Sequence, residues 1–305
     1  MFDTHYDLLT IVYTLKDNKK YLKKIIKDLN KNYKGVIANL FFMNKKEMKE
    51  ELNINNINVL DMFIKSKQIL KKYKLKSKIL YSIEGCDYIK DSKELEQLTK
   101  QGLNAILLVW NNQSKYASGI RTTKGLTKKG EQFIKKAIDL KLGIDLSHAN
   151  EKTFYDIIRI ITKSKKTVTC YASHSNIYNL HNHPRNLKEK QLQALKSVNG
   201  KLGIVCYPEF LTNSKEKNKI KENYLKHIEN AVKIMGINNV MVSTDNMDFY
   251  YQLNNINPPS IPFNQNKIKK EMKKLLKIKF KNKDIKKIMY KNAEKLYKKL
   301  SSNIK

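Results

Sequence analysis

The chain has 305 residues, enough for one large domain or two ordinary ones. It lacks a signal-like start and any run of the roughly 18 apolar residues that a membrane helix needs, so we expect a cytoplasmic protein. The formal net charge of +33 would suggest nucleic acid, but only three of the 61 basic residues are arginine and the lysines follow helical faces. We therefore expect no specific nucleic-acid partner, and a nonenzymatic polyanion-binding protein stays a remote alternative.

Eight short apolar runs alternate along the chain with longer, lysine-rich helical patterns. Such alternation produces parallel strands joined by helices, and eight units favour a (β/α)8 barrel over an open doubly wound sheet. The expected strands lie within residues 2–12, 35–43, 78–85, 104–110, 142–148, 167–174, 201–207 and 239–245. The expected helices cover residues 19–31, 58–74, 93–102, 128–141, 151–165, 189–198 and 215–236.

No linker or composition shift divides this alternating pattern. We therefore predict one α/β domain over residues 1–305, a TIM barrel with two C-terminal helices from about residue 265. The asparagine-rich segments 51–59 and 250–260 are typical of surface loops.

Most of the apolar runs end in a residue that is capable of chemistry. Glu84, Trp110, His148, His174 and Asp245 each stand at the C-terminal side of a different run. A barrel places its active site at the C-terminal ends of its strands. We expect these side chains to face one shared site.

Two pairs of residues have the spacing of metal ligands. His5 and Asp7 lie two residues apart, so on an extended strand they point to the same face. His148 and His174 are separated by one strand–helix–strand step, which places them on neighbouring strand ends. Each residue alone also fits an ordinary polar or hydrogen-bonded position. Together with Glu84 they indicate two divalent ions bridged by a carboxylate, which is a hydrolytic arrangement.

Other polar residues in the chain have simpler interpretations. Arg185 stands out among lysines, and its planar fork is suited to gripping a carboxylate, although an ordinary loop arginine is the alternative. Asp245 has the chemistry to exchange a proton beside a metal-bound water. We expect His181 and His183 to be loop residues that position Arg185, and His227 to be solvated on a lysine-rich helix.

Several motifs, in the same order, resemble the metal-dependent membrane dipeptidases, also called renal-dipeptidase-like or M19 peptidases. The resemblance covers most of the chain, and the series GLT, G, DLSH, SHS and RN is specific. It rests on DTHYD at residues 3–7, EG at 84–85, the segment 109–157 with GLT and DLSH, ASHSNIYNLHNHPRNL at 172–187, and VSTD at 242–245.

The resemblance implies a (β/α)8 barrel of the metal-dependent hydrolase type that hydrolyses dipeptides, often with a D-residue at the C-terminal position, and that forms homodimers. It implies that a hydroxide bridging two zinc ions attacks the peptide carbonyl. Arg185 would hold the substrate and Asp245 would move the proton. Five residues would bind the metals, with Glu84 bridging both: His5, Asp7, Glu84, His148 and His174. The alternative is another two-metal amide, lactone or β-lactam hydrolase.

Three features depart from the family pattern. Trp110 stands where the mammalian enzymes have a substrate-binding histidine, and it resembles many bacterial members, so we expect it to contact substrate. After Asp245 the chain reads NMDFYYQ instead of the usual DFDG, which makes Asp248 an alternative acid. The charged ending KLYKKLSSNIK lacks the mammalian lipid-anchor signal, so we expect no membrane anchor.

Overall fold

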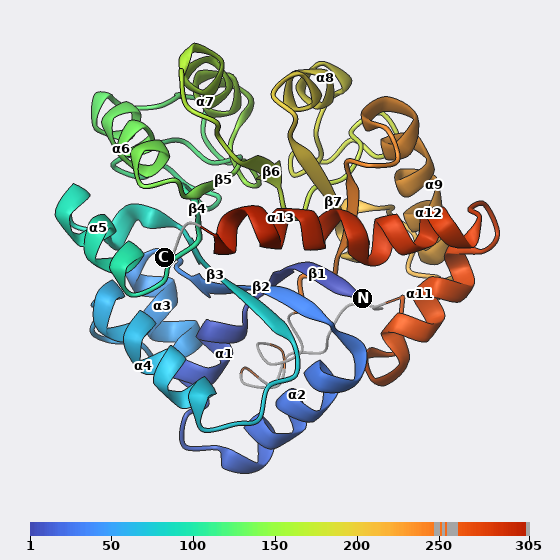
Figure 1. Ribbon diagram of the computed structural model, residues 1–305, viewed down its shortest axis with the longest axis horizontal. Coiled ribbons are helices and arrows are strands. Elements are labelled where there is room, and N and C mark those ends of the chain that lie inside the picture. Colours follow the sequence, from blue (N-terminus) through green and yellow to red (C-terminus); the bar gives the residue numbers. More distant parts are fainter. Residues whose placement is uncertain (247–250, 252–253, 255–261, 303–305) are drawn as a thin grey trace.

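In the residues that the structure describes, 1–246, 251, 254 and 262–302, eight parallel strands close into a barrel in chain order (Figure 1). The structure is a computed structural model, and it confirms the predicted (β/α)8 architecture. Pairing of Asp3 with Val242 joins the first strand to the last and closes the sheet. The strands are β1 (Phe2–Tyr6), β2 (Gly35–Phe41), β3 (Lys78–Glu84), β4 (Ala105–Leu107), β5 (Gly143–Asp145), β6 (Cys170–Ala172), β7 (Lys201–Val205) and β8 (Val240–Ser243).

Helices connect the strands and surround the barrel (Figure 1). Those between strands are α1 (Leu8–Thr14), α2 (Lys19–Asn32), α3 (Lys45–Leu52), α4 (Val59–Lys71), α5 (Ser92–Lys100), α6 (Lys128–Asp139), α7 (Glu151–Lys163), α8 (Glu189–Ser197) and α9 (Lys217–Met235). After the barrel come α11 (Ile268–Leu276) and α12 (Asn282–Lys286), which continues through a π-helical turn (Lys287–Lys291) into α13 (Asn292–Ser301).

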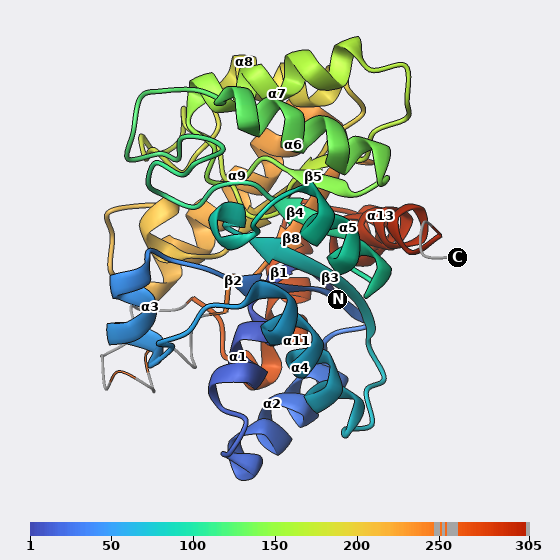
Figure 2. The same ribbon diagram turned by 90° about the vertical axis from the view of Figure 1, so that its left-hand side faces the viewer.

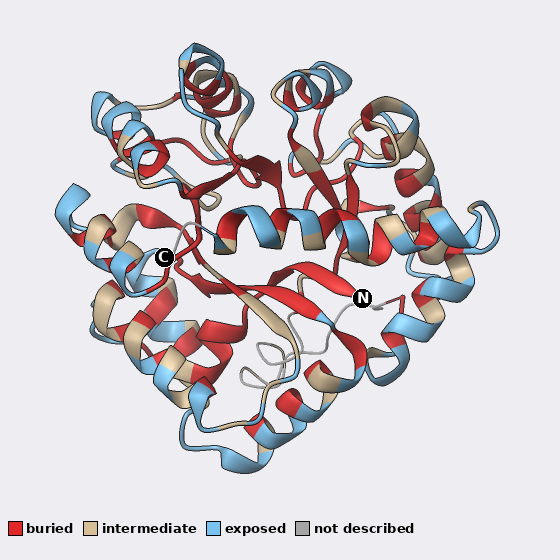
Figure 3. Cartoon of the chain, in the orientation of Figure 1, coloured by how far each residue is buried: buried red, intermediate tan, exposed pale blue. Residues whose placement is uncertain are grey.

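The outer helices form because each has one apolar face that packs on the strands. In α6, Phe133, Ile134 and Ala137 are buried at helical spacing, while the exposed residues of the same helix lie on its outer side (Figure 3). The Thr127 side chain starts this helix by accepting a hydrogen bond from the Gly130 N–H, which would otherwise have no partner in the helix.

Among the described residues, two α-helices, α1 and α3, were not predicted from the sequence. The apolar run 2–12 is a strand only to Tyr6, and its second half forms α1. A fully buried run has no clear periodicity, so a strand and a helix look alike in sequence. Segment 51–59 begins inside α3, which Asn44 starts with a capping box to Glu47. Most of segment 250–260 lies outside the described residues.

Helix α13 closes the barrel at the end where its strands begin. Its Ala293, Leu296 and Leu300 are buried in an apolar cluster with residues from the starts of the strands, including Phe2 and Leu80. Figure 2 shows α13 on the side where the chain starts. The opposite mouth, at the C-terminal ends of the strands, is the one that carries the polar residues.

Candidate active site

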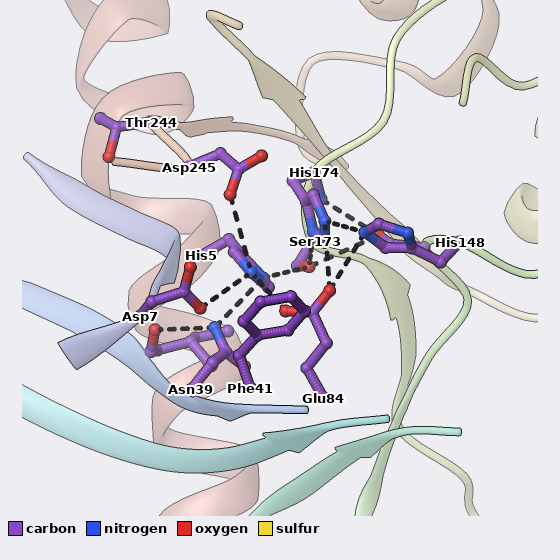
Figure 4. Close-up of polar contacts among 12 residues, drawn as sticks. His5, Asp7, Asn39, Phe41, Glu84, His148, Ser173, His174, Thr244 and Asp245 are labelled. Carbon is purple, nitrogen blue, oxygen red and sulfur yellow. Dashed lines mark hydrogen bonds and ion pairs between the residues drawn. The ribbon is translucent and has the colours of Figure 1, made fainter. Parts of the chain in front are cut away.

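The five predicted metal ligands converge at the C-terminal mouth of the barrel (Figure 4). Glu84 lies in the middle of the group: its Oε2 is 2.9 Å from His5 Nε2, and its Oε1 is 3.0 Å from His148 Nε2. The Nε2 atoms of His148 and His174 are 2.9 Å apart. Asp7 Oδ1 is 3.6 Å from His5 Nε2. The site therefore has two halves that share one carboxylate.

The strand ends hold these side chains in place. Glu84 is the last residue of β3, and His148, His174 and Asp245 follow β5, β6 and β8 within three residues. His148 has φ 65° and Asp245 has φ 48°, left-handed backbone that costs a residue other than glycine about 1–3 kcal/mol. Such strain persists only where the surrounding structure imposes it, and it is common at functional sites.

The hydrogen bonds of His148 prepare one of its ring nitrogens for a metal. Its Nδ1 lies 2.7 Å from Asn111 Oδ1, which accepts hydrogen bonds and cannot donate them. Nδ1 therefore carries the proton, and the lone pair of Nε2 faces Glu84 and His174. A neutral imidazole fixed in this tautomer is the form that binds metal.

The side chain of Ser173 links the two halves of the site. Its Oγ lies 2.7 Å from His174 Nδ1 and 3.1 Å from His5 Nδ1. Asn39 Nδ2 also lies 3.1 Å from His5 Nδ1. Sequence reasoning missed Ser173, Asn39 and Asn111. Two of them had a visible signal, since Asn39 interrupts an apolar strand and Ser173 directly precedes His174.

Burial sets the protonation of these groups in opposite directions. Burial raises the pKa of Glu84 to about 7 and also raises the pKa of Asp245. Burial, together with nearby cationic groups such as Arg185, lowers the pKa of His148 and His174 well below the usual value. For His5, burial lowers the pKa, but the charges of Glu84 and Asp7 outweigh it and raise the pKa overall. A divalent cation would favour the charged carboxylates and neutral imidazoles.

The donor atoms fit divalent metal ions. Two groups of donors, each with its atoms within 4.8 Å of one another, are His5 with Asp7 and Asp245, and Glu84 with His148 and His174. Asp7 Oδ1 is buried and accepts no hydrogen bond from the described residues, so a cation would satisfy it. Imidazole and carboxylate donors are a set that zinc prefers.

A third group of donors contains Asp145 with His5 and His174. The Oδ1 atom of Asp145 already accepts the backbone N–H groups of Ser147 and Ser173, each at 3.0 Å. Asp145 therefore fixes the loops after β5 and β6, and it thereby orients His174.

A pocket of about 340 Å³ opens above these donors. Arg185 forms part of its wall and is 3% exposed. Its Nη2 donates to His174 O at 3.0 Å, while its Nε is buried without a hydrogen-bond partner in the described residues. Burial lowers the pKa of Arg185 to about 10. An anion in the pocket would satisfy the free N–H.

The remaining histidines divide between the loop and a buried helix face. His183 Nδ1 accepts the backbone N–H of Arg185 at 3.2 Å, and His181 Nε2 contacts Glu209 O at 3.1 Å. The prediction that His227 is solvated is wrong: it is 1% exposed, and its Nδ1 accepts the Ile177 N–H at 3.0 Å. The reason is position, because His227 lies on the buried face of α9.

Trp110 lines the same pocket. Its ring lies edge-on to Phe41, with centroids 5.2 Å apart, and 6.2 Å from the ring of His148. Arg121 covers the indole, with Cζ 5.8 Å from the ring centroid. The alternative acid Asp248 lies outside the described residues.

The helices of the described residues give no sign of a membrane span, since none combines sufficient length with sufficient apolar character. This finding concerns residues 1–246, 251, 254 and 262–302.

Curated relatives match part of the chain. A protein from the pqqA 5′ region of Klebsiella pneumoniae, described as uncharacterized, is 30% identical over 165 residues, which are 51% of this chain and 59% of the relative. A protein described as an uncharacterized dipeptidase of Schizosaccharomyces pombe is 26% identical over 162 residues, 52% of this chain and 38% of the relative. The chain spans about half the length of the curated relatives it matches.

Among solved structures, a metallo peptidase from Rhodobacter sphaeroides, liganded with a phosphinate mimic of the dipeptide L-Ala-D-Ala, has a TM-score of 0.76 and 17% identity, and the match covers 98% of both chains. At this identity the likeness supports the fold.

The model of the membrane dipeptidase family matches residues 23–304. This range includes Glu84, His148, His174, Arg185 and Asp245, and it begins after the DTHYD motif. Because the match extends over most of the barrel and the C-terminal helices α11, α12 and α13, the chain belongs to the membrane dipeptidase family, peptidase family M19.

Proposed function

We propose that this protein is a zinc-dependent dipeptidase that hydrolyses the peptide bond of dipeptides, including those with a D-residue at the C-terminal position. The observation that carries the proposal is the position of Glu84 between His5 on one side and His148 on the other, at the base of a pocket that Arg185 lines. Family membership supports the reaction class. The phosphinate mimic of a dipeptide in the Rhodobacter sphaeroides protein supports the substrate class.

Five side chains would hold two zinc ions: His5 and Asp7 at the first, His148 and His174 at the second, and Glu84 at both. When bound, the ions would lower the pKa of a water between them towards about 7 and polarise the peptide carbonyl. Asn111 and Ser173 would keep the imidazoles of His148 and His174 in the tautomer and orientation that this needs.

The other pocket residues would bind the substrate and move its proton. Arg185 offers its unpartnered Nε to the terminal carboxylate of the dipeptide. Asp245, whose side chain is 16% exposed and lies 3.9 Å from His5 Nε2, would take a proton from the attacking water and return it to the leaving amine. Trp110 would pack against the substrate beside His148. We also propose that the protein acts as a cytoplasmic homodimer, which analytical ultracentrifugation and fractionation can test.

The test is a substrate profile of the purified protein loaded with zinc. Ala-Ala and Ala-D-Ala are compared with an N-acyl amino acid, a lactone and a β-lactam, and bound metal is measured by mass spectrometry. We expect dipeptide turnover and about two zinc ions per chain. Turnover of a lactone or β-lactam alone would assign the competing reaction, and zinc-loaded protein without dipeptide turnover would refute the proposal.

A further inference from the structure

The cationic residues that line the pocket are arginines, although most basic residues of the chain are lysines. Of the 61 basic residues three are arginine, and two of these, Arg121 and Arg185, line the pocket above the metal donors. Among the described residues that form this wall there is no lysine. Arginine offers a planar fork that pairs with a carboxylate through two hydrogen bonds, whereas lysine acts as a point charge.

Hydrogen bonds from backbone and side-chain donors fix the loop that carries Arg121. Its N–H donates to Asn111 O at 2.8 Å, next to Trp110. Thr122 Oγ1 donates to Gly119 O at 2.9 Å, and Asn150 Nδ2 donates to Thr122 O at 2.7 Å. A Cβ atom on Gly119 would lie 1.9 Å from Trp110 O, so only glycine allows this close approach. The loop is therefore built against the indole, and the guanidinium lies over it.

The guanidinium of Arg121 has no carboxylate partner within 4.0 Å in the described part of the chain. The guanidinium lies instead over the face of the Trp110 ring. The cation–π contact with the indole restrains the side chain. A carboxylate in the pocket that Arg121 lines would give the guanidinium an ionic partner.

A count of charges points to the missing partner. In the proposed function Asp7, Glu84 and Asp245 face the metals. The described residues of the wall then keep two cations, Arg121 and Arg185, and one anion, Glu209. A neutral dipeptide brings one ammonium and one carboxylate, which leaves one positive charge unmatched. A dipeptide with an acidic side chain brings a second carboxylate and completes the pairing.

We propose that Arg121 is a specificity residue that pairs with a second carboxylate of the substrate, so that the enzyme prefers dipeptides containing Asp or Glu. This inference rests on the proposed dipeptidase function. It differs from a general attraction of acidic substrates to the lysine-rich surface, because it assigns the preference to the side chain of Arg121, which lies over Trp110.

The test compares substrates that differ only in charge: Ala-Glu with Ala-Gln, and Glu-Ala with Gln-Ala. For the natural protein we expect kcat/KM to be about 10-fold higher for the acidic member of one pair. The pair that shows the difference identifies which residue of the dipeptide, N-terminal or C-terminal, pairs with Arg121. Arg121→Gln should reduce this ratio to about one, mainly through KM, and Arg121→Lys should retain part of it.

Lys124→Gln is the matched control, because it removes one exposed positive charge from the same loop outside the pocket wall. It should leave the ratio unchanged. Calorimetry with phosphinate analogues of Ala-Glu and Ala-Gln gives a second readout, in which Arg121→Gln should remove the preference for the acidic analogue.

The outcomes separate the two proposals. Turnover of Ala-Ala without any acidic preference, or a preference that survives Arg121→Gln, would overturn the role of Arg121 and leave the dipeptidase intact. An equal loss of preference in Lys124→Gln would assign it to the overall surface charge and likewise overturn the role. Absence of all dipeptide turnover would overturn the dipeptidase and this inference with it.

Discussion

The two mouths of the barrel are built from the same eight strands but have opposite character. At the N-terminal mouth, Phe2 and Leu80 pack against Leu296 and Leu300 of α13, and the cluster is apolar. At the C-terminal mouth, Glu84 and its neighbours are equally buried, yet they are polar, and burial shifts the pKa values of several of them. One end contributes mainly to stability, whereas the other places charges where burial opposes them.

The largest effect should come from the polar mouth. Glu84→Gln removes the carboxylate shared by both halves of the site, and we expect kcat/KM to fall by about 10³-fold or more, with loss of bound zinc. Without metal, the free energy of unfolding of the variant should be no lower than that of the natural protein, because the substitution removes a buried carboxyl of raised pKa.

Exposed Glu131→Gln on α6 is the control for this prediction and should leave kcat/KM, bound zinc and the free energy of unfolding unchanged. If Glu84→Gln retained full metal content and activity, the polar mouth would not be the reaction centre. Metal analysis, steady-state kinetics and urea unfolding measure the three quantities.

The apolar mouth should respond in the opposite way. Leu296→Ala leaves a cavity against the strand starts, and we expect the free energy of unfolding to drop by about 2–5 kcal/mol. The kcat/KM of the folded fraction should stay the same. Urea unfolding checks the first expectation, with exposed Lys299→Ala on the same helix as control. A large loss of activity in Leu296→Ala without a loss of stability would contradict the view that the apolar mouth serves stability and the polar mouth serves the reaction.

A smaller effect should come from a residue that orients a ligand. Asn111→Ala removes the acceptor for His148 Nδ1–H, so the neutral ring is no longer held with Nε2 towards Glu84. We expect zinc affinity to weaken by about 10- to 100-fold, with activity restored by excess zinc. Competition with a chelator measures the affinity.

The neighbouring Asn112→Ala serves as its control, because Asn112 contributes a backbone carbonyl to Gly119 N–H, which the substitution retains. Equal zinc affinities in all three proteins would show that Asn111 does not act on the metal site.

The smallest effect concerns the pH dependence of stability and comes from His227, whose Nδ1 accepts the N–H of Ile177 in the loop after β6. Burial lowers the pKa of His227 to about 4, against about 6.5 in the unfolded chain. Between these values the unfolded state binds more protons, so stability falls as the pH is lowered through this window. We expect a loss of about 1–2 kcal/mol between pH 6.5 and pH 5 from this residue.

The variant His227→Asn does not titrate in this range and should flatten that part of the stability curve, as measured by urea unfolding at several pH values. An unchanged slope would mean that other groups produce the acid sensitivity.

The sequence predicted the barrel because its strand–helix period is regular, and the strand ends indicated which side chains would converge. Other features depend on tertiary contacts and leave weak traces in sequence. α1 was missed because a run buried on all sides has neither helical nor strand periodicity. His227 was misjudged because lysines flank it, although its own face of α9 is buried. Asn111 and Ser173 matter through the imidazoles they touch, which no spacing rule reveals.

The closure of the barrel by α13 also has a consequence for synthesis in the cell. The apolar ends of the strands come from residues as early as Phe2, but the helix that covers them, Asn292–Ser301, is made after all eight strands. A nascent chain can therefore complete all eight strands on the ribosome and still expose this cluster to solvent or to chaperones. Docking of α13 would be the step that covers this cluster and completes the folded barrel.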